Sequence, residues 1–125
     1  MCRFFVAYWK TLLCAAGIAV LSLVSFSVFA VPAVSLVPYA DKWVHALMYA
    51  ALAVAAFADC RAQGLSRGTW AFLLLLPPIY GGVLELLQEF CTATRSGDWL
   101  DLLADTMGGW LALAACALSV KRLKA

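Results

Sequence analysis

Four long apolar stretches, separated by short polar segments, dominate the chain. They are Thr11–Val31, Asp41–Asp59, Thr69–Phe90 and Trp99–Val120. Each stretch is close to the ~20 residues that a helix needs to cross the hydrocarbon core of a bilayer. The second reaches this length only when its polar start, residues 41–45, is included, which places those groups at the membrane boundary or in a protected cavity. The pattern predicts an all-α polytopic membrane protein with one domain over residues 1–125 and four transmembrane helices.

The composition excludes an ordinary soluble domain. Of the 125 residues, 66% are hydrophobic and only 13% are charged, and the mean hydropathy is +0.93. Arg3 and Lys10 before the first apolar stretch, and the small residues around Ala30, also fit a secretory signal peptide. Because that stretch exceeds the roughly 7–15 apolar residues of a signal peptide, we expect a retained helix. The five cysteines show no C-x-x-C spacing, so we expect neither a disulfide nor a thiolate metal site.

Basic residues flank the apolar stretches on one predicted side of the membrane. They precede the first stretch, separate the second from the third and follow the fourth, and they are Arg3, Lys10, Arg61, Arg67, Lys121, Arg122 and Lys124. Loops rich in lysine and arginine stay in the cytoplasm. We therefore expect both termini and the middle loop to be cytoplasmic, with residues 30–40 and 91–97 facing outward.

Polar residues concentrate at the helix ends that are predicted to face outward. The group holds six of the seven carboxylates and the single histidine, and it consists of Asp41, Lys42, His45, Tyr49, Glu85, Gln88, Glu89, Arg95, Asp98, Asp101 and Asp105. At 100° of rotation per residue, the polar side chains of each helix fall within an arc of about 100° or less. Each ionisable group at mid-bilayer costs roughly 2.5–3.5 kcal/mol, so such a concentration indicates function. We expect the stripes to face one another around an outward-open polar pocket.

Three residues of this group lie one or more turns inside the apolar stretches and are the predicted catalytic groups. Glu85 or Asp105 would act as a general acid or base and His45 would carry a proton, while Arg95 would clamp an anion. The predicted substrate-binding residues are Asp41, Lys42, Tyr49, Gln88, Arg95, Asp98 and Asp101. A structural network of hydrogen bonds is the alternative interpretation.

A divalent metal is a further alternative for the same residues. Carboxylates and one histidine supply hard oxygen and imidazole ligands, but the spacing lacks a dedicated signature such as H-E-x-x-H, so the metal stays open. Local structural roles are also open for the residues at the helix ends. Asp41 and Asp98 stand where helix N-caps are expected, and Lys42 can extend to the interface. Trp43 and Trp99 fit an interfacial aromatic belt.

Two backbone features accompany the polar pocket. Pro77-Pro78, followed by Gly81-Gly82, predicts that the third helix kinks or breaks. Gly108-Gly109 lies one turn beyond Asp105 and would let a neighbouring helix approach closely.

The polar residues occur in an ordered series of three motifs. The series is Asp41-Lys42-Trp43-Val44-His45, then Glu85-Leu86-Leu87-Gln88, and then Arg95 leading to Asp98, Asp101, Asp105 and Gly108. This order, which covers the chain from Asp41 to the last apolar stretch, resembles the VanZ-like family. The family's namesake is an accessory glycopeptide-resistance protein associated with low-level resistance to teicoplanin, a lipid-tailed antibiotic. The resemblance implies a cell-envelope role in a bacterial-type cytoplasmic membrane. Met107 stands where an asparagine is expected in relatives, so a hydrogen-bonding amide would be missing.

Three classes of function are open on this sequence. The first is a membrane-embedded enzyme that modifies an outer-leaflet lipid, a lipid-linked cell-wall precursor or a lipoglycopeptide. The second is a non-enzymatic protein that binds such a lipid or antibiotic. The third is a small transporter, which fits less well because alternating access places the polar site near mid-membrane. The net charge of +2 comes from the cytoplasmic flanks, with no basic patch among aromatic residues, so we expect no nucleic-acid partner.

Overall fold

The protein folds into helices, as predicted. The computed structural model describes residues 1–24, 38–93 and 97–124. In this part of the chain it has five helices, which are α1 (Cys2–Ala7), α2 (Trp9–Leu23), α3 (Ala40–Gln63), α4 (Arg67–Cys91) and α5 (Trp99–Lys124). Among the described residues, three helices, α3, α4 and α5, are long and apolar enough to cross a membrane, and α2 is a shorter apolar helix. These helices suggest a multi-pass membrane protein.

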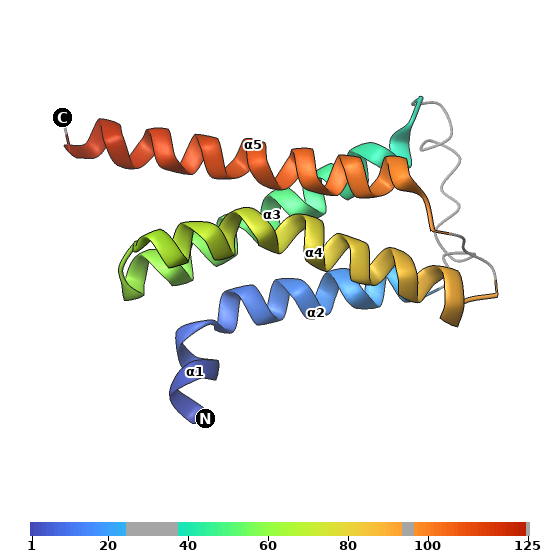
Figure 1. Ribbon diagram of the computed structural model, residues 1–125, viewed down its shortest axis with the longest axis horizontal. Helices are drawn as coiled ribbons and strands as arrows, with labels where there is room; N and C mark the ends of the chain where they lie inside the picture. Colours follow the sequence, from blue (N-terminus) through green and yellow to red (C-terminus); the bar gives the residue numbers. More distant parts are fainter. Residues whose placement is uncertain (25–37, 94–96, 125) are drawn as a thin grey trace.

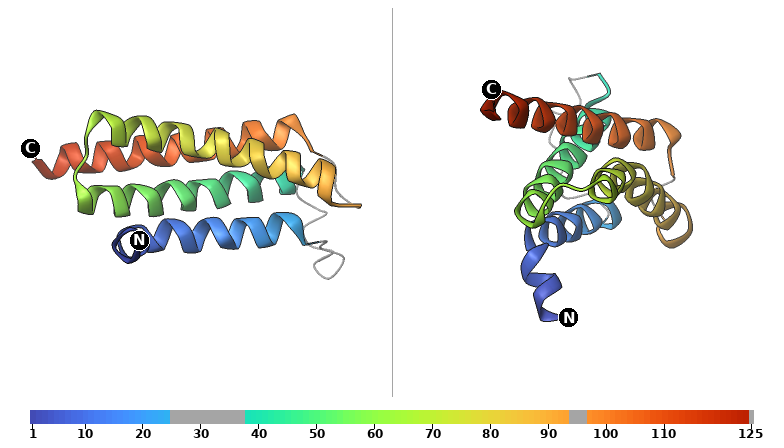
Figure 2. Two further views of the ribbon diagram at one scale, coloured as in Figure 1. Left: turned by 60° about the horizontal axis from the view of Figure 1, so that its bottom comes forward. Right: turned by 60° about the vertical axis from the view of Figure 1, so that its left-hand side comes forward.

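The four longer helices run side by side along one axis and alternate in direction (Figures 1 and 2). α3 is central, since it packs against α2, α4 and, most extensively, α5. The chain begins and ends at one end of the bundle, which also holds the turn between α3 and α4 (Figure 1). The other end holds the start of α3, the end of α4 and the start of α5, so the predicted polar turns share one level.

α2 differs most from its predicted extent. The sequence predicts a helix over Thr11–Val31, but α2 begins at Trp9 and ends at Leu23, where Val24 adopts an extended backbone. The rest of the predicted stretch lies outside the described residues. The carbonyl of Ser22 in the last turn accepts a 2.8 Å hydrogen bond from Nε2 of Gln88 in α4. A neighbouring helix therefore satisfies one of the carbonyl groups that a helix end leaves free.

The other three long helices extend past their predicted ends. α3 runs to Gln63 instead of Asp59 and stops at Gly64, whose φ of 106° suits a residue without a side chain. α4 starts at Arg67 behind a capping box, in which Ser66 and Thr69 exchange side-chain and backbone hydrogen bonds. α5 continues to Lys124 instead of Val120. The short helix α1 was not expected from the apolar pattern.

α4 runs through Pro77 and Pro78 as one helix, so the predicted break is wrong, whereas a kink stays a prediction. Pro77 is fully buried. Its ring packs closely against Gly109 of α5, where a Cβ would collide with it. This packing helps offset the two backbone donors that the prolines remove. At the preceding residue of α5, a Cβ at Gly108 would overlap the backbone of Ala46 in α3. The prediction that Gly108-Gly109 permits close helix approach is confirmed.

Two apolar clusters fill the bundle on either side of its middle. The cluster nearer the chain ends contains Ala53, Ala56, Phe57, Cys60, Leu73 and Leu113. The cluster nearer the polar turns contains Ile18, Tyr49, Leu52 and Leu84. Many other large apolar side chains point outward, including Leu75, Leu111 and Val83. An apolar exterior of this extent suits a lipid environment.

Asp59, the seventh carboxylate, fastens α2 to α3 at the end where the chain begins. Its Oδ2 accepts hydrogen bonds from the backbone N–H of Thr11 at 2.9 Å and from the Thr11 hydroxyl at 2.8 Å. Its Oδ1 accepts from Nζ of Lys10 at 2.9 Å. Because Thr11 lies in the first turn of α2, Asp59 serves as an N-cap supplied by the neighbouring helix. This role of Asp59 was not predicted from the sequence.

Candidate functional site

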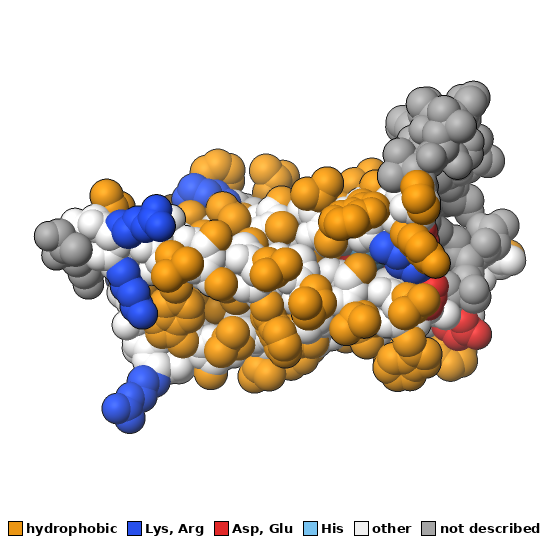
Figure 3. Space-filling view, turned by 90° about the horizontal axis from the view of Figure 1, so that it is seen from above, with side chains coloured by type: hydrophobic (Ala, Val, Ile, Leu, Met, Phe, Trp, Pro, Cys, Tyr) orange, Lys and Arg blue, Asp and Glu red, His pale blue; other side chains and the backbone are white. Residues whose placement is uncertain are grey.

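Six of the seven acidic groups lie at one end of the bundle, and most basic groups lie at the other end with Asp59. On the face shown in Figure 3, most lysine and arginine side chains gather at the end that holds the C-terminus, and the visible acidic side chains lie at the other end. The acidic end is where α3 starts, α4 ends and α5 starts. The structure thus brings the polar turns of three helices together, as the stripes predicted.

Lys42 links the first turns of α3 and α5. Its Nζ lies 2.9 Å from Oδ2 of Asp41, 2.7 Å from Oδ2 of Asp98 and 2.5 Å from Oδ1 of Asp101. The Lys42 side chain is only 19% exposed. It forms these ion pairs and does not extend to the membrane interface, which was the alternative role for it. One ammonium group serves three carboxylates, which leaves this cluster with an excess of negative charge.

Asp98 caps α5, which confirms that prediction. Its Oδ1 accepts a 2.9 Å hydrogen bond from the backbone N–H of Leu100, in the first turn of the helix. The Lys42 ammonium, followed by this N–H, holds the pKa of the Asp98 carboxyl below its usual value. The corresponding prediction for Asp41 is wrong. Tyr39 is the N-cap of α3, and Asp41 lies inside the first turn, where it pairs with Lys42.

His45 and Asp105 form a buried pair between α3 and α5. Nδ1 of His45 lies 2.9 Å from Oδ1 of Asp105, and both residues are almost fully buried. When Asp105 is ionised, its carboxylate can only accept, so Nδ1 of His45 is the donor of this bond in that state. Nε2 then faces Oδ2 of Asp101 at 3.8 Å, beyond hydrogen-bond distance. The histidine is therefore oriented by one carboxylate and has its second nitrogen directed toward another.

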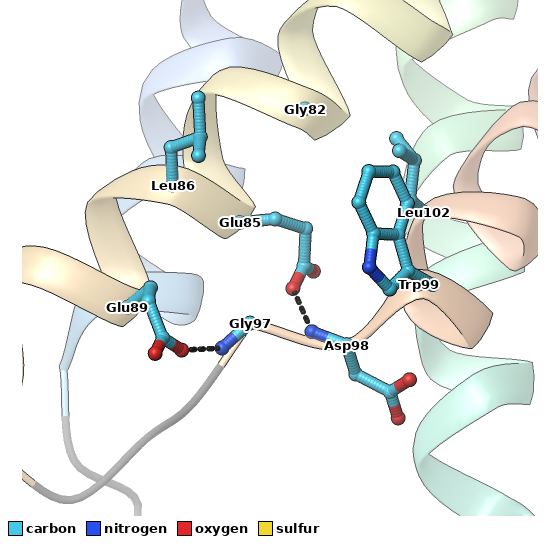
Figure 4. Close-up of a pocket in the computed structure, with 8 residues that line it drawn as sticks. All are labelled: Gly82, Glu85, Leu86, Glu89, Gly97, Asp98, Trp99 and Leu102. Atoms are coloured by element: carbon cyan, nitrogen blue, oxygen red, sulfur yellow. Dashed lines mark hydrogen bonds between the residues drawn. The ribbon is translucent and has the colours of Figure 1, made fainter.

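Two glutamates of α4, one helical turn apart, form hydrogen bonds with the backbone segment that leads into α5. Oε2 of Glu85 accepts from the backbone N–H of Asp98 at 2.7 Å, and Oε2 of Glu89 accepts from that of Gly97 at 2.8 Å (Figure 4). A Cβ at Gly97 would lie only 3.0 Å from the Glu85 carbonyl oxygen, so the chain passes close to α4 here. Glu85 is buried, whereas Glu89 is exposed.

His45, Glu85 and Asp105 converge from three different helices. One ligand atom of each lies within 4.8 Å of the others. Gly81 makes room for this arrangement, because a Cβ there would lie 2.8 Å from Oδ2 of Asp105. One nitrogen and two oxygens at this spacing could hold a divalent cation, so a metal stays an open alternative at these three residues. Without one, the same groups can exchange protons over one hydrogen bond or one bridging water.

The other residues that the sequence predicts for the site do not belong to the trio of His45, Glu85 and Asp105. Tyr49 is 1% exposed and belongs to the apolar cluster below the pair, where its ring lies 6.2 Å from that of Tyr80. Gln88 is buried, with its Nε2 bonded to the Ser22 carbonyl. Arg95 lies outside the described residues. Met107 is 48% exposed on α5, so its side chain is not enclosed with the buried trio.

A groove opens beside Glu85, between α4 and α5. It has a volume of about 430 Å³ and is lined by Gly82, Glu85, Leu86, Glu89, Gly97, Asp98, Trp99 and Leu102. Figure 4 shows Glu85 between the two helices, with Leu86 and Glu89 on one side and Trp99 and Leu102 on the other. This volume is within the range of small-molecule sites. The sequence predicted a polar pocket formed by these carboxylates but not its apolar half, although Gly82, which carries no side chain, was a signal for open space.

No protein-family model, curated protein or solved structure matches the chain. The resemblance to the VanZ-like family therefore rests on the three motifs alone. The geometry is compatible with those motifs acting together, since His45, Glu85 and Asp105 come from one motif each and lie in one buried trio.

Proposed function

We propose that this chain is a VanZ-like protein of a bacterial cytoplasmic membrane, with four transmembrane helices and both termini in the cytoplasm. In this proposal, α2 is the shortest crossing. Its 15 residues span about 22 Å as a helix, and the apolar sequence continues to Val31. The polar end of the bundle faces outward, because seven of the nine lysines and arginines flank the opposite ends of the helices in the sequence.

The proposed activity is acid–base chemistry on a lipid, a lipid-linked cell-wall precursor or a lipoglycopeptide at the outer leaflet. The observation that carries it is the convergence of His45, Glu85 and Asp105 within 4.8 Å. Nε2 of His45 takes a proton from the attacking hydroxyl or water, while Asp105 holds Nδ1–H and stabilises the imidazolium that forms. Once the attacking oxygen has bonded to the substrate, Glu85, next to the groove, receives this proton from the imidazolium and passes it to the departing group as the bond to that group breaks.

Glu85→Gln tests this activity while preserving the local structure. The amide oxygen of glutamine still accepts the Asp98 N–H bond, but the side chain can no longer transfer a proton at neutral pH. In cells that express the chain, we expect the wild type to raise tolerance to teicoplanin, and the variant and His45→Gln to lose at least about 90% of that gain. Mass spectrometry of extracted lipids should show a product with the wild type alone.

Arg61→Gln is the matched control, because it also removes one charge but from an exposed position at the opposite end of the bundle. It should leave both readouts unchanged. Full tolerance with Glu85→Gln, at equal amounts of protein in the membrane, would refute the acid–base role.

A non-enzymatic binding protein is the second candidate, and the groove beside Glu85 is the observation that favours it. For such a protein, the tolerance would fall gradually with conservative changes along the groove, and no product would form. The transporter is less supported, because the polar trio lies near one end of the helices.

A further inference from the structure

The groove between α4 and α5 changes from polar to apolar along the helix axis. Its outer rim carries the carboxylates of Glu89 and Asp98, and Glu85 follows one turn deeper. Beyond them, Gly82 and Leu102 form an apolar floor. From Glu89 to Gly82 the groove covers about 10 Å along α4. A lipid in the outer leaflet has the same order, with its head group at the interface and its chains directed toward mid-membrane.

The apolar half of the groove is open space. A Cβ at Gly82 would meet no atom within 4 Å, in contrast with Gly81, Gly108 and Gly109, each of which faces a packed neighbour. An alkyl chain can therefore lie over Gly82 without displacing protein atoms. Trp99 forms one wall and is 84% exposed, which suits a ring that lies at the membrane interface.

The charges along the groove favour one sign of charge on the head group. Three of its lining residues are carboxylates, and none of the residues described along it is basic. Lys42 neutralises Asp98, but among the described residues Glu85 and Glu89 have only backbone N–H partners. The carboxylates of Glu85 and Glu89 repel a phosphate that lies directly against them. A protonated amine would find two carboxylates and the face of an indole ring.

We propose that this groove binds an outer-leaflet lipid whose head group carries a protonated primary amine, with the start of one acyl chain over Gly82. The outward orientation rests on the proposed function. The amine donates hydrogen bonds to Glu85 and Glu89, and the chain passes between Leu86 and Leu102. This occupant places its head group next to the buried trio of His45, Glu85 and Asp105.

Lipid retention tests this proposal on the full-length protein. The protein is purified from detergent containing equal amounts of dioleoyl phosphatidylethanolamine, phosphatidylcholine and phosphatidylglycerol, and bound lipids are counted by native mass spectrometry. The three head groups share a phosphate, but only the first has a primary amine. One charge-assisted hydrogen bond corresponds to roughly tenfold in affinity, so we expect about tenfold preference for phosphatidylethanolamine over each of the other two.

Two variants separate the polar from the apolar half of the groove. The double change Glu85→Gln and Glu89→Gln keeps the acceptors for the Asp98 and Gly97 N–H groups but should abolish the preference. Gly82→Leu fills the floor without touching a charge, and it should lower retention of phosphatidylethanolamine about tenfold. Arg61→Gln, at the other end of the bundle, should behave as the wild type.

Equal or stronger retention of phosphatidylglycerol would overturn the proposal, as would an unchanged preference in the double glutamine variant or unchanged retention of phosphatidylethanolamine in Gly82→Leu. Failure here is distinguishable from failure of the proposed function. If Glu85→Gln abolishes teicoplanin tolerance while no lipid is preferred, the site acts on another molecule. If the preference is found without any effect on tolerance or product, the groove is a lipid site and the acid–base activity is wrong.

Discussion

Replacing Asp59 with alanine should loosen α2 from the rest of the bundle. The change removes the acceptor of two buried hydrogen bonds from Thr11, each of which is worth about 1.5–3 kcal/mol because the acceptor is charged. One of these two bonds is the cap of the Thr11 backbone N–H. The ion pair adds little, because the Lys10 side chain is 44% exposed. We expect Asp59→Ala to lower the free energy of unfolding by about 3–5 kcal/mol and Lys10→Gln to lower it by at most about 1 kcal/mol.

Reversible unfolding in mixed micelles, followed by circular dichroism, measures both values. Asp59→Asn is an informative third variant, because it keeps an oxygen for Thr11 but removes the charge, and it should fall between the other two. The reasoning is refuted if Lys10→Gln costs as much as Asp59→Ala, since the exposed ion pair would then be the main attachment. A loss below 1 kcal/mol for Asp59→Ala would also refute it.

The glycines and the Lys42 cluster carry further predictions. Gly108→Ala should lower the thermal midpoint by several degrees, because its Cβ overlaps the Ala46 backbone, whereas Gly82→Ala should raise it slightly, and differential scanning fluorimetry compares the two. Asp98→Asn should destabilise the protein at neutral pH. Because the folded pKa of Asp98 is depressed by Lys42, its stabilisation is present above the usual carboxyl value of 3.8 and is lost as the pH falls through the folded pKa. The difference in thermal midpoint between wild type and variant should therefore vanish in acid. A difference that stays constant with pH would contradict a stabilising ion pair between Asp98 and Lys42.

Much of the helical arrangement could be predicted from the sequence, because long apolar stretches and charge at their ends leave few alternatives. The meeting of His45, Glu85 and Asp105 followed from helical periodicity together with alternating helix direction. The cap at Asp98 followed from its position just before an apolar run. These features depend on local spacing and on burial, which the pattern of residue types records directly.

Other features depend on contacts between distant segments, which local patterns do not record. Asp59 looks like the polar end of an apolar stretch, yet it caps a helix 48 residues earlier in the chain. The end of α2 is set in part by an amide from α4, and nothing near Leu23 in the sequence signals it. The prolines of α4 fit a continuous helix because Gly109 of α5 accommodates the ring of Pro77. Each case requires the tertiary partner before the local outcome can be understood.

A role at the outer leaflet requires that the acidic end of the bundle faces the cell exterior, and two native cysteines test this orientation without any mutation. Cys91 ends α4 at the acidic end and Cys2 lies at the opposite end, and both are exposed. Intact spheroplasts are treated with a membrane-impermeant maleimide, and the modified peptides are identified by mass spectrometry. We predict labelling of Cys91 and protection of Cys2 until the membrane is permeabilised. Labelling of Cys2 with protection of Cys91 in sealed cells would place the buried trio at the cytoplasmic side and contradict the proposed role at the outer leaflet.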